Sequence, residues 1–139
     1  MSIETIAQNL PALFAALLVS ILFIQSGLDK IFDRRGNLEW LTGHFSKTFL
    51  APLVPILLVT ITVMELAAGV LCATGIVYFL FTSSAVLIFV ASVIAAFSIT
   101  SLFFGQRIAK DYAGAAILIP YFILVAILMY LTSPFSKAS

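Results

Sequence analysis

Between Lys47 and Arg107 the chain runs for fifty-nine residues with one charged side chain, Glu65. A helix needs about 20 predominantly apolar residues to cross the hydrocarbon core of a membrane. This stretch is therefore long enough for two crossings, and uncharged stretches at 5–28 and 112–136 provide two more. Only 9% of the residues are charged, against roughly a quarter in a soluble domain. The pattern predicts an integral membrane protein with four spanning helices.

Prolines and glycines place the expected helices within the chain. We expect helices over 3–32, 52–75, 76–104 and 109–133. Pro52 and Pro55 suit the first turn of the second helix, where a backbone N–H has no partner within the helix. Thr74 and Gly75 are expected to end that helix, and Pro120 to kink or loosen the fourth.

A shorter helix is expected between the first two spans. Apolar side chains recur there at helical spacing, at Leu38, Leu41, Phe45 and Phe49. We expect this helix to lie in the interface plane, with Trp40 at headgroup depth. Because short connections make sequential helices antiparallel neighbours, the expected fold is all-α: a single domain over 1–139 that forms an up-down four-helix membrane bundle.

Basic residues are distributed unevenly between the two ends of this bundle. Six of the seven fall in the connections at one end, namely Lys30, Arg34, Arg35, Lys47, Arg107 and Lys110. The positive-inside rule assigns that end to the cytoplasm and places both termini on the other side. A net charge of +1 gives no reason to expect nucleic acid as a partner.

Charged residues from the first and fourth helices are expected to gather at the basic end. The expected rim cluster contains Asp29, Lys30, Arg107, Lys110 and Asp111. It could form a polar mouth for a substrate, or a belt of salt bridges with snorkelling side chains. Within it we expect Lys30 to pair with Asp111, with Asp33 as the local alternative.

Glu65 is expected to point into the bundle, because it shares a helix face with small residues such as Gly69. An ionisable group inside a membrane is a functional candidate by default, although a protonated structural Glu is the alternative. Counted at about 1.5 Å per residue from the basic end, Ser20, Ser92 and Tyr121 fall at the same depth as Glu65. Lys30 and Asp111 fall about 15 Å above this layer. We therefore expect a protonated Glu65, hydrogen-bonded within a narrow pocket formed by these three hydroxyl side chains.

Other reactive residue types are scarce. Cys72 is the only cysteine, so no intramolecular disulfide or dithiol pair can form, and we expect it to serve as a packing residue. His44 is the only histidine and is expected to be a plain interfacial residue. No spacing of residues predicts a metal site, a catalytic triad or a phosphate-binding loop.

Three short motifs resemble the DoxX family of small bacterial membrane proteins with four helices. They are "SGLDKIFD" at the end of the first helix, "MELAAGVLCATGI" in the second and "KDYAGAAILI" entering the fourth. Lys30, Glu65, Gly69 and Asp111 match recurrent positions of that family. The resemblance implies a multi-pass protein of the bacterial inner membrane.

The same resemblance implies a quinone- or redox-associated membrane subunit, in which Glu65 relays a proton or hydrogen-bonds a quinone. The alternative is a non-catalytic accessory or scaffold subunit, and whether the chain is itself an enzyme stays open. Because it has neither a pair of histidines for haem nor a cysteine cluster, we expect no intrinsic cofactor. The expected partners are membrane lipid and either other membrane subunits or further copies of the chain.

Overall fold

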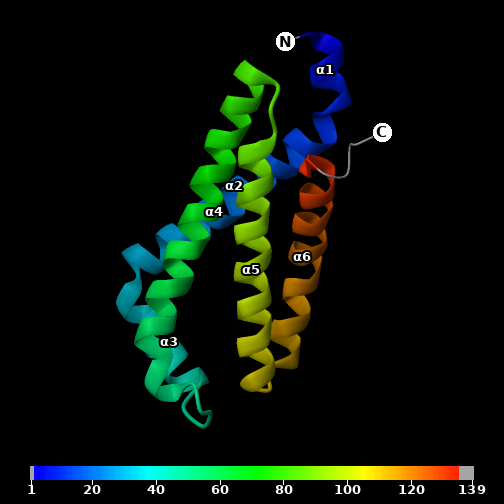
Figure 1. Ribbon diagram of the computed structural model, residues 1–139. Coiled ribbons are helices and arrows are strands. Elements are labelled where there is room, and N and C mark those ends of the chain that lie inside the picture. The colour runs from blue at the N-terminus through cyan, green and yellow to red at the C-terminus, as the bar shows by residue number, and fades with distance from the viewer. Residues whose placement is uncertain (1, 135–139) are drawn as a thin grey trace.

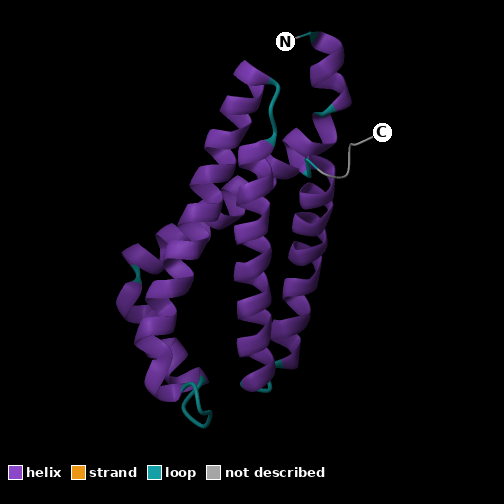
Figure 2. Cartoon of the chain, in the orientation of Figure 1, coloured by secondary structure: helices purple, strands orange, loops and turns teal. Residues whose placement is uncertain are grey.

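A computed structural model describes residues 2–134 of the chain. The described part is helical with short connections (Figure 2). Its elements in chain order are α1 (Ile3–Gln8), α2 (Leu10–Phe32), α3 (Arg34–His44), the short 3-10 helix η1 (Ala51–Leu53), α4 (Val54–Thr82), α5 (Val86–Ile108) and α6 (Tyr112–Thr132). Four of these are long and apolar enough to span a membrane: α2, α4 with η1, α5 and α6. The expected four-helix membrane bundle is confirmed.

The first expected helix is interrupted, and α1 and α2 meet at Asn9. Asn9 has φ −105° and ψ 7°, outside the helical region, and it precedes Pro11 in the first turn of α2. Proline has no N–H, and its ring clashes with the carbonyl group four residues earlier. A continuous helix through Pro11 is therefore unfavourable, and the chain begins a new helix there.

The second spanning helix is longer than expected, because Gly75 does not end it. α4 continues to Thr82 and closes at Ser83, which adopts a left-handed conformation with φ 61°. Gly75 instead lies against α5, and a Cβ atom there would stand 2.8 Å from the backbone nitrogen of Ile88. The glycine thus permits close helix packing and does not mark a turn.

The third and fourth spans are shifted along the chain as a result. α5 ends at Ile108, beyond the expected residue 104, and α6 begins at Tyr112 rather than at residue 109. Asp111 caps α6, because its side chain accepts a hydrogen bond from the backbone N–H of Gly114 at 2.9 Å. Pro120 lies within α6, as expected.

The expected short helix between the first two spans is α3, which begins at Arg34. It packs against α4, and Figure 1 shows it descending beside the lower half of that helix. Its 11 residues correspond to about 16 Å of helix. α4 therefore begins well beyond the level at which α2 ends.

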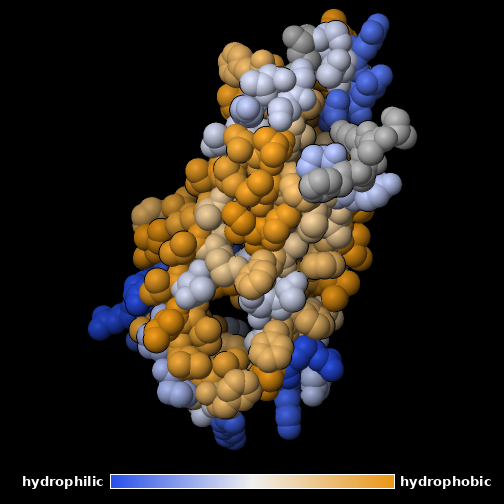
Figure 3. All heavy atoms as spheres, in the orientation of Figure 1, coloured by the Kyte–Doolittle hydropathy of each residue, from blue (hydrophilic) through white to orange (hydrophobic). Residues whose placement is uncertain are grey.

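The long helices pack in series, α2 against α4, α4 against α5 and α5 against α6. α2 makes a smaller contact with α6, and Figure 1 shows it crossing behind α4 and α5 at a tilt. Small side chains line the contacts, with Ala16, Ala68, Ala91 and Ala95 fully buried. The outer surface is mainly hydrophobic along the spans (Figure 3), as expected for contact with lipid.

Candidate functional site

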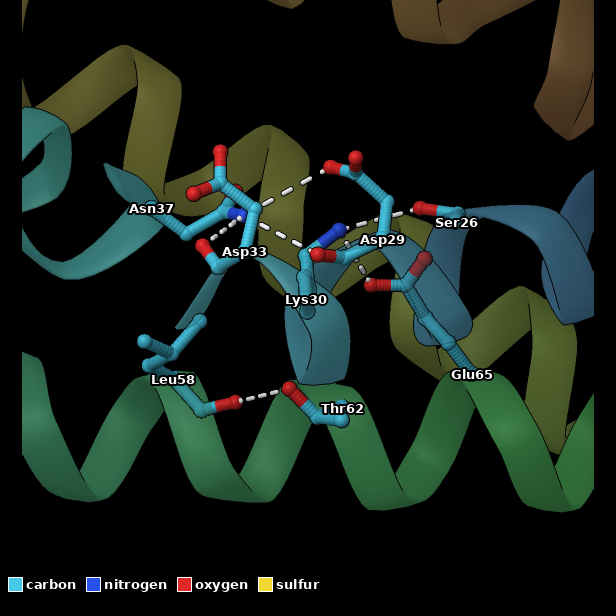
Figure 4. Close-up of polar contacts among 8 residues, drawn as sticks. All are labelled: Ser26, Asp29, Lys30, Asp33, Asn37, Leu58, Thr62 and Glu65. Carbon is cyan, nitrogen blue, oxygen red and sulfur yellow. Dashed lines mark hydrogen bonds and ion pairs between the residues drawn. The ribbon is translucent and has the colours of Figure 1, made fainter. Parts of the chain in front are cut away.

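Lys30 and Glu65 form an ion pair in the interior of the bundle (Figure 4). The Lys30 Nζ and Glu65 Oε1 atoms are 2.9 Å apart, and the two side chains are 16% and 3% exposed, respectively. Two opposite charges in one low-dielectric site compensate each other, whereas either alone would be costly. The pair is the main polar feature of the spanning region.

One further group contacts the ammonium. Lys30 Nζ donates a hydrogen bond to Ser26 Oγ at 2.9 Å, one turn earlier on α2. An ammonium has three N–H donors, so one remains after the contacts with Ser26 and Glu65. The ammonium is therefore the partner of the buried Glu65 Oε1 atom, which lies at ion-pair distance from it.

Glycines on both helices bring the two charges together. A Cβ atom at Gly27 would lie 2.6 Å from the Leu66 side chain, and one at Gly69 would lie 2.7 Å from the backbone nitrogen of Ile24. α2 and α4 therefore approach closely on either side of the pair. This approach places the end of α2 beside the middle of α4.

The structure corrects the expected partner of Lys30. Lys30 pairs with Glu65, and neither Asp111 nor Asp33 forms an ion pair with it. The expected depth difference of about 15 Å assumed that α2 and α4 reach the basic end at one level. The length of α3 is about equal to that distance, so α4 begins further along and Lys30 lies level with Glu65. The expectation that no cation lies within reach of Glu65 is accordingly wrong.

The expected hydroxyl layer around Glu65 is also wrong. Ser20 Oγ donates to the Ala16 carbonyl at 2.8 Å, and Ser92 Oγ donates to the Phe89 carbonyl at 2.6 Å, so both bond within their own helices. Tyr121 is 39% exposed, on the outer surface of α6. The expected depths were counted from helix ends that lie elsewhere in the structure. Residues expected to share one depth are therefore apart in the bundle.

The charged rim residues form separate contacts and not one cluster. Asp29 Oδ2 accepts a hydrogen bond from Asn37 Nδ2 at 3.5 Å (Figure 4). The Arg107 guanidinium lies 4.5 Å from the centre of the Tyr112 ring, a cation–π contact. Lys110 is exposed and adopts φ 60° in the turn before α6.

His44 takes part in the contact that joins α3 to the turn between α5 and α6. Its Nε2 atom lies 2.7 Å from Gln106 Oε1 and 3.7 Å from Asp111 Oδ2, and its ring stacks on Trp40 with 4.4 Å between centroids. This role could not be predicted from the sequence, because the partners are more than sixty residues away.

Ser98 on α5 is a buried polar residue that the sequence alone did not single out. The contact between Gly75 and Ile88 fixes the register of the antiparallel α4 and α5. Glu65 lies ten residues from Gly75, and Ser98 lies ten residues from Ile88, which is about 15 Å along each helix. Ser98 is fully buried, and its Oγ atom has no hydrogen-bond partner in the described structure.

The remaining candidates have simple structural roles. Cys72 is buried, as expected, and its Sγ atom donates to the Ala16 carbonyl at 3.3 Å. Residues 2–134 contain no group of three potential metal ligands. No protein-family model, curated protein or solved structure matches this chain.

Proposed function

We propose that this chain is a DoxX-like membrane subunit that binds a quinone at the Lys30–Glu65 pair. The observation that carries the proposal is the ion pair itself, because charged groups inside a membrane are costly and are generally associated with function. The remaining N–H of Lys30 suits a quinone carbonyl, and Glu65 suits proton transfer. The sequence motifs near both residues support the family assignment.

Reduction of a quinone takes up two electrons and two protons. The chain contains one cysteine and one histidine, too few for a cysteine-ligated cluster or bis-histidine haem. A partner protein with its own redox cofactor would therefore supply the electrons, and this chain would supply the quinone site and a proton path. The proposed location is the bacterial inner membrane, with both termini in the periplasm.

Quinone retention tests this proposal. The protein would be purified from its native membrane in mild detergent, and bound quinone would be quantified by mass spectrometry after extraction. Wild type should retain quinone, whereas Lys30→Met and Glu65→Gln should lose most of it. Asp33→Asn is the matched control, because Asp33 belongs to the same end of α2 without contacting the pair. Wild type without quinone above the detergent background would exclude the proposal.

An accessory subunit is the second candidate, and the exposure of α6 favours it. Only 17% of the most apolar stretch of α6 is buried, against 33–39% in the other spans. This helix leaves most of its surface for lipid or for a partner membrane subunit. In that case the ion pair would fix the register of α2 and α4. Quinone-free protein that copurifies in stoichiometric amount with another membrane subunit would favour this candidate.

A further inference from the structure

The spanning helix α2 carries two polar side chains on its outer face. Gln25 and Asp29, one turn apart, are both exposed. Together with apolar side chains such as Leu17, Ile21 and Leu28 they line an open groove of about 670 Å³ along this helix. A surface that contacts only lipid is expected to be apolar throughout, so these two polar groups need an explanation.

Gln25 lies at the depth of the bilayer centre. Its neighbour Ile24 meets Gly69 of α4, because a Cβ atom at Gly69 would stand 2.7 Å from the Ile24 backbone nitrogen. Gly69 is about 20 Å from either end of α4, which runs from Val54 to Thr82. The hydrocarbon core of a bilayer extends about 15 Å to either side of its centre. Gln25 is therefore well inside the core, and the next turn of α2 carries Asp29 about 6 Å nearer the basic end.

The chain itself gives these two groups little hydrogen bonding. The Gln25 amide forms no hydrogen bond with any other residue of 2–134. The Asp29 carboxylate has one long hydrogen bond, 3.5 Å from Asn37 Nδ2 (Figure 4). The bilayer core offers no water, and polar side chains there generally bond to a neighbouring helix. This favours a partner helix over the groove.

Charges of both signs continue this face beyond the end of α2. Asp33, Arg34 and Arg35 are exposed and form no ion pair within residues 2–134. With Asp29 they make a patch of two acids and two arginines, which has no net charge. Such a patch is complementary to a second copy of itself, whereas a partner surface of one sign would leave half of its charges unpaired. The Gln25 amide is also self-complementary, because it has both N–H donors and a carbonyl acceptor.

We propose that the outer face of α2 joins two copies of this chain into a dimer. The two Gln25 amides bond to each other, and Asp29 of each copy faces Arg34 or Arg35 of the other. In a twofold dimer one patch meets the same patch of the second copy, which this amide and this charge pattern allow. The apolar side chains of the groove then pack around the amides. The inference does not depend on the proposed quinone site, because the ion pair of that site is in the interior of the bundle.

Cysteine cross-linking in native membranes tests where the two copies meet. Ile21→Cys and Leu28→Cys, which flank Gln25 in the groove, should each give a disulfide-linked dimer on mild oxidation, because such a bond needs Cα atoms within about 7 Å. Val63→Cys is the matched control, since Val63 is 61% exposed at a similar depth on α4. The natural Cys72 is buried and should not cross-link.

The strength of association can be measured by energy transfer between donor- and acceptor-labelled copies at increasing dilution with lipid. Gln25→Leu, which keeps the groove apolar, should raise the dissociation constant about tenfold, because two hydrogen bonds between the amides are lost. Thr100→Val is the control, since Thr100 is exposed on α5 and donates to the Ala96 carbonyl of its own helix. It should leave the dissociation constant unchanged.

An exchange of charges separates loss of the contact from loss of the fold. Asp29→Arg makes the patch positive, and the double variant Arg34→Asp with Arg35→Asp makes it negative, so neither should dimerise alone. An equimolar mixture of the two should form mixed dimers, because each acid then meets an arginine again.

Three results would overturn the proposal. The first is cross-linking of Val63→Cys that equals that of Leu28→Cys. The second is a charge-exchanged mixture that stays monomeric although both variants keep the helix content of wild type. The third is cross-linking of the groove cysteines to a different membrane protein, which would show that another subunit covers this face.

Discussion

At the scale of single residues, Lys30 and Glu65 decide the polarity of the bundle interior. Each would be unfavourable alone, because a charge that loses its hydration in an apolar medium destabilises the fold unless an opposite charge lies close by. At 2.9 Å the two charges compensate each other. Ser26, one turn earlier on the same helix as Lys30, accepts a further hydrogen bond from the ammonium.

Removing one charge of this pair should therefore be more harmful than removing both. Lys30→Met or Glu65→Gln should lower the free energy of unfolding by about 3–5 kcal/mol, since the remaining charge is buried without compensation. The double variant should recover most of this loss. The measurement is a double-mutant cycle of reversible unfolding in mixed detergent. Additive losses in the double variant would show that the two residues do not interact.

The charge state of Glu65 can be measured separately. Because Lys30 lies at ion-pair distance, Glu65 should be ionised at neutral pH. The infrared difference between wild type and Glu65→Gln should contain a carboxylate band and no band of a protonated acid. Asp111→Asn, which changes the cap of α6, should leave that particular band in place. A protonated-acid band lost in Glu65→Gln would mean that the pair is neutral.

At the scale of helices, glycine contacts control how closely the spans approach. Gly69 on α4 meets the backbone of α2, and Gly75 on the same helix meets the backbone of α5. Small residues at such contacts allow backbones to pack closely in membranes, where association depends on packing and hydrogen bonds. The ion pair between Lys30 and Glu65 depends on the first contact, and the register of α4 against α5 depends on the second.

Gly69→Ala should destabilise the bundle, because its Cβ atom would lie 2.7 Å from the backbone nitrogen of Ile24 and the helices would have to separate. We expect a loss of about 1–3 kcal/mol in unfolding free energy. Gly43→Ala is the control: no atom lies within 4 Å of its added Cβ, and the gain in helix propensity is at most about 1 kcal/mol. Equal thermal stability of the two variants in detergent would contradict this account of the α2–α4 contact.

At the scale of the whole molecule, four crossings bring α1 and the C-terminal end of α6 to one end of the bundle (Figure 1). The α2–α4 connection and the α5–α6 turn lie at the other end with the basic residues. Because the ion pair with Glu65 holds Lys30 inside the bundle, Lys30 is not informative about the orientation of the protein in the membrane. Lys47, Arg107 and Lys110 remain at that end, and Arg34 and Arg35 begin α3, which leads to it. Together these residues outnumber the basic residues at the opposite end.

We therefore predict that the C-terminus is periplasmic, because the positive-inside rule assigns the basic end to the cytoplasm. An alkaline phosphatase fused after the last residue should be active, and green fluorescent protein fused there should not fluoresce. Lys30→Met should leave both results unchanged. A fluorescent, phosphatase-inactive pair of fusions would reverse the assignment.

The number of spans, the all-helical fold and the candidacy of Glu65 were predictable without tertiary contacts. They depend on the lengths of apolar stretches and on the cost of an isolated charge in a membrane. Local signals were less informative about helix ends: Gly75 resembles a helix stop but lies in a helix–helix contact. The partner of Glu65, in contrast, depends on how the helices pack against one another. α3 shifts α4 along its axis relative to α2, and glycine contacts set the register that brings Lys30 level with Glu65. That register comes from packing between segments distant in the chain, and counting residues along separate helices cannot supply it.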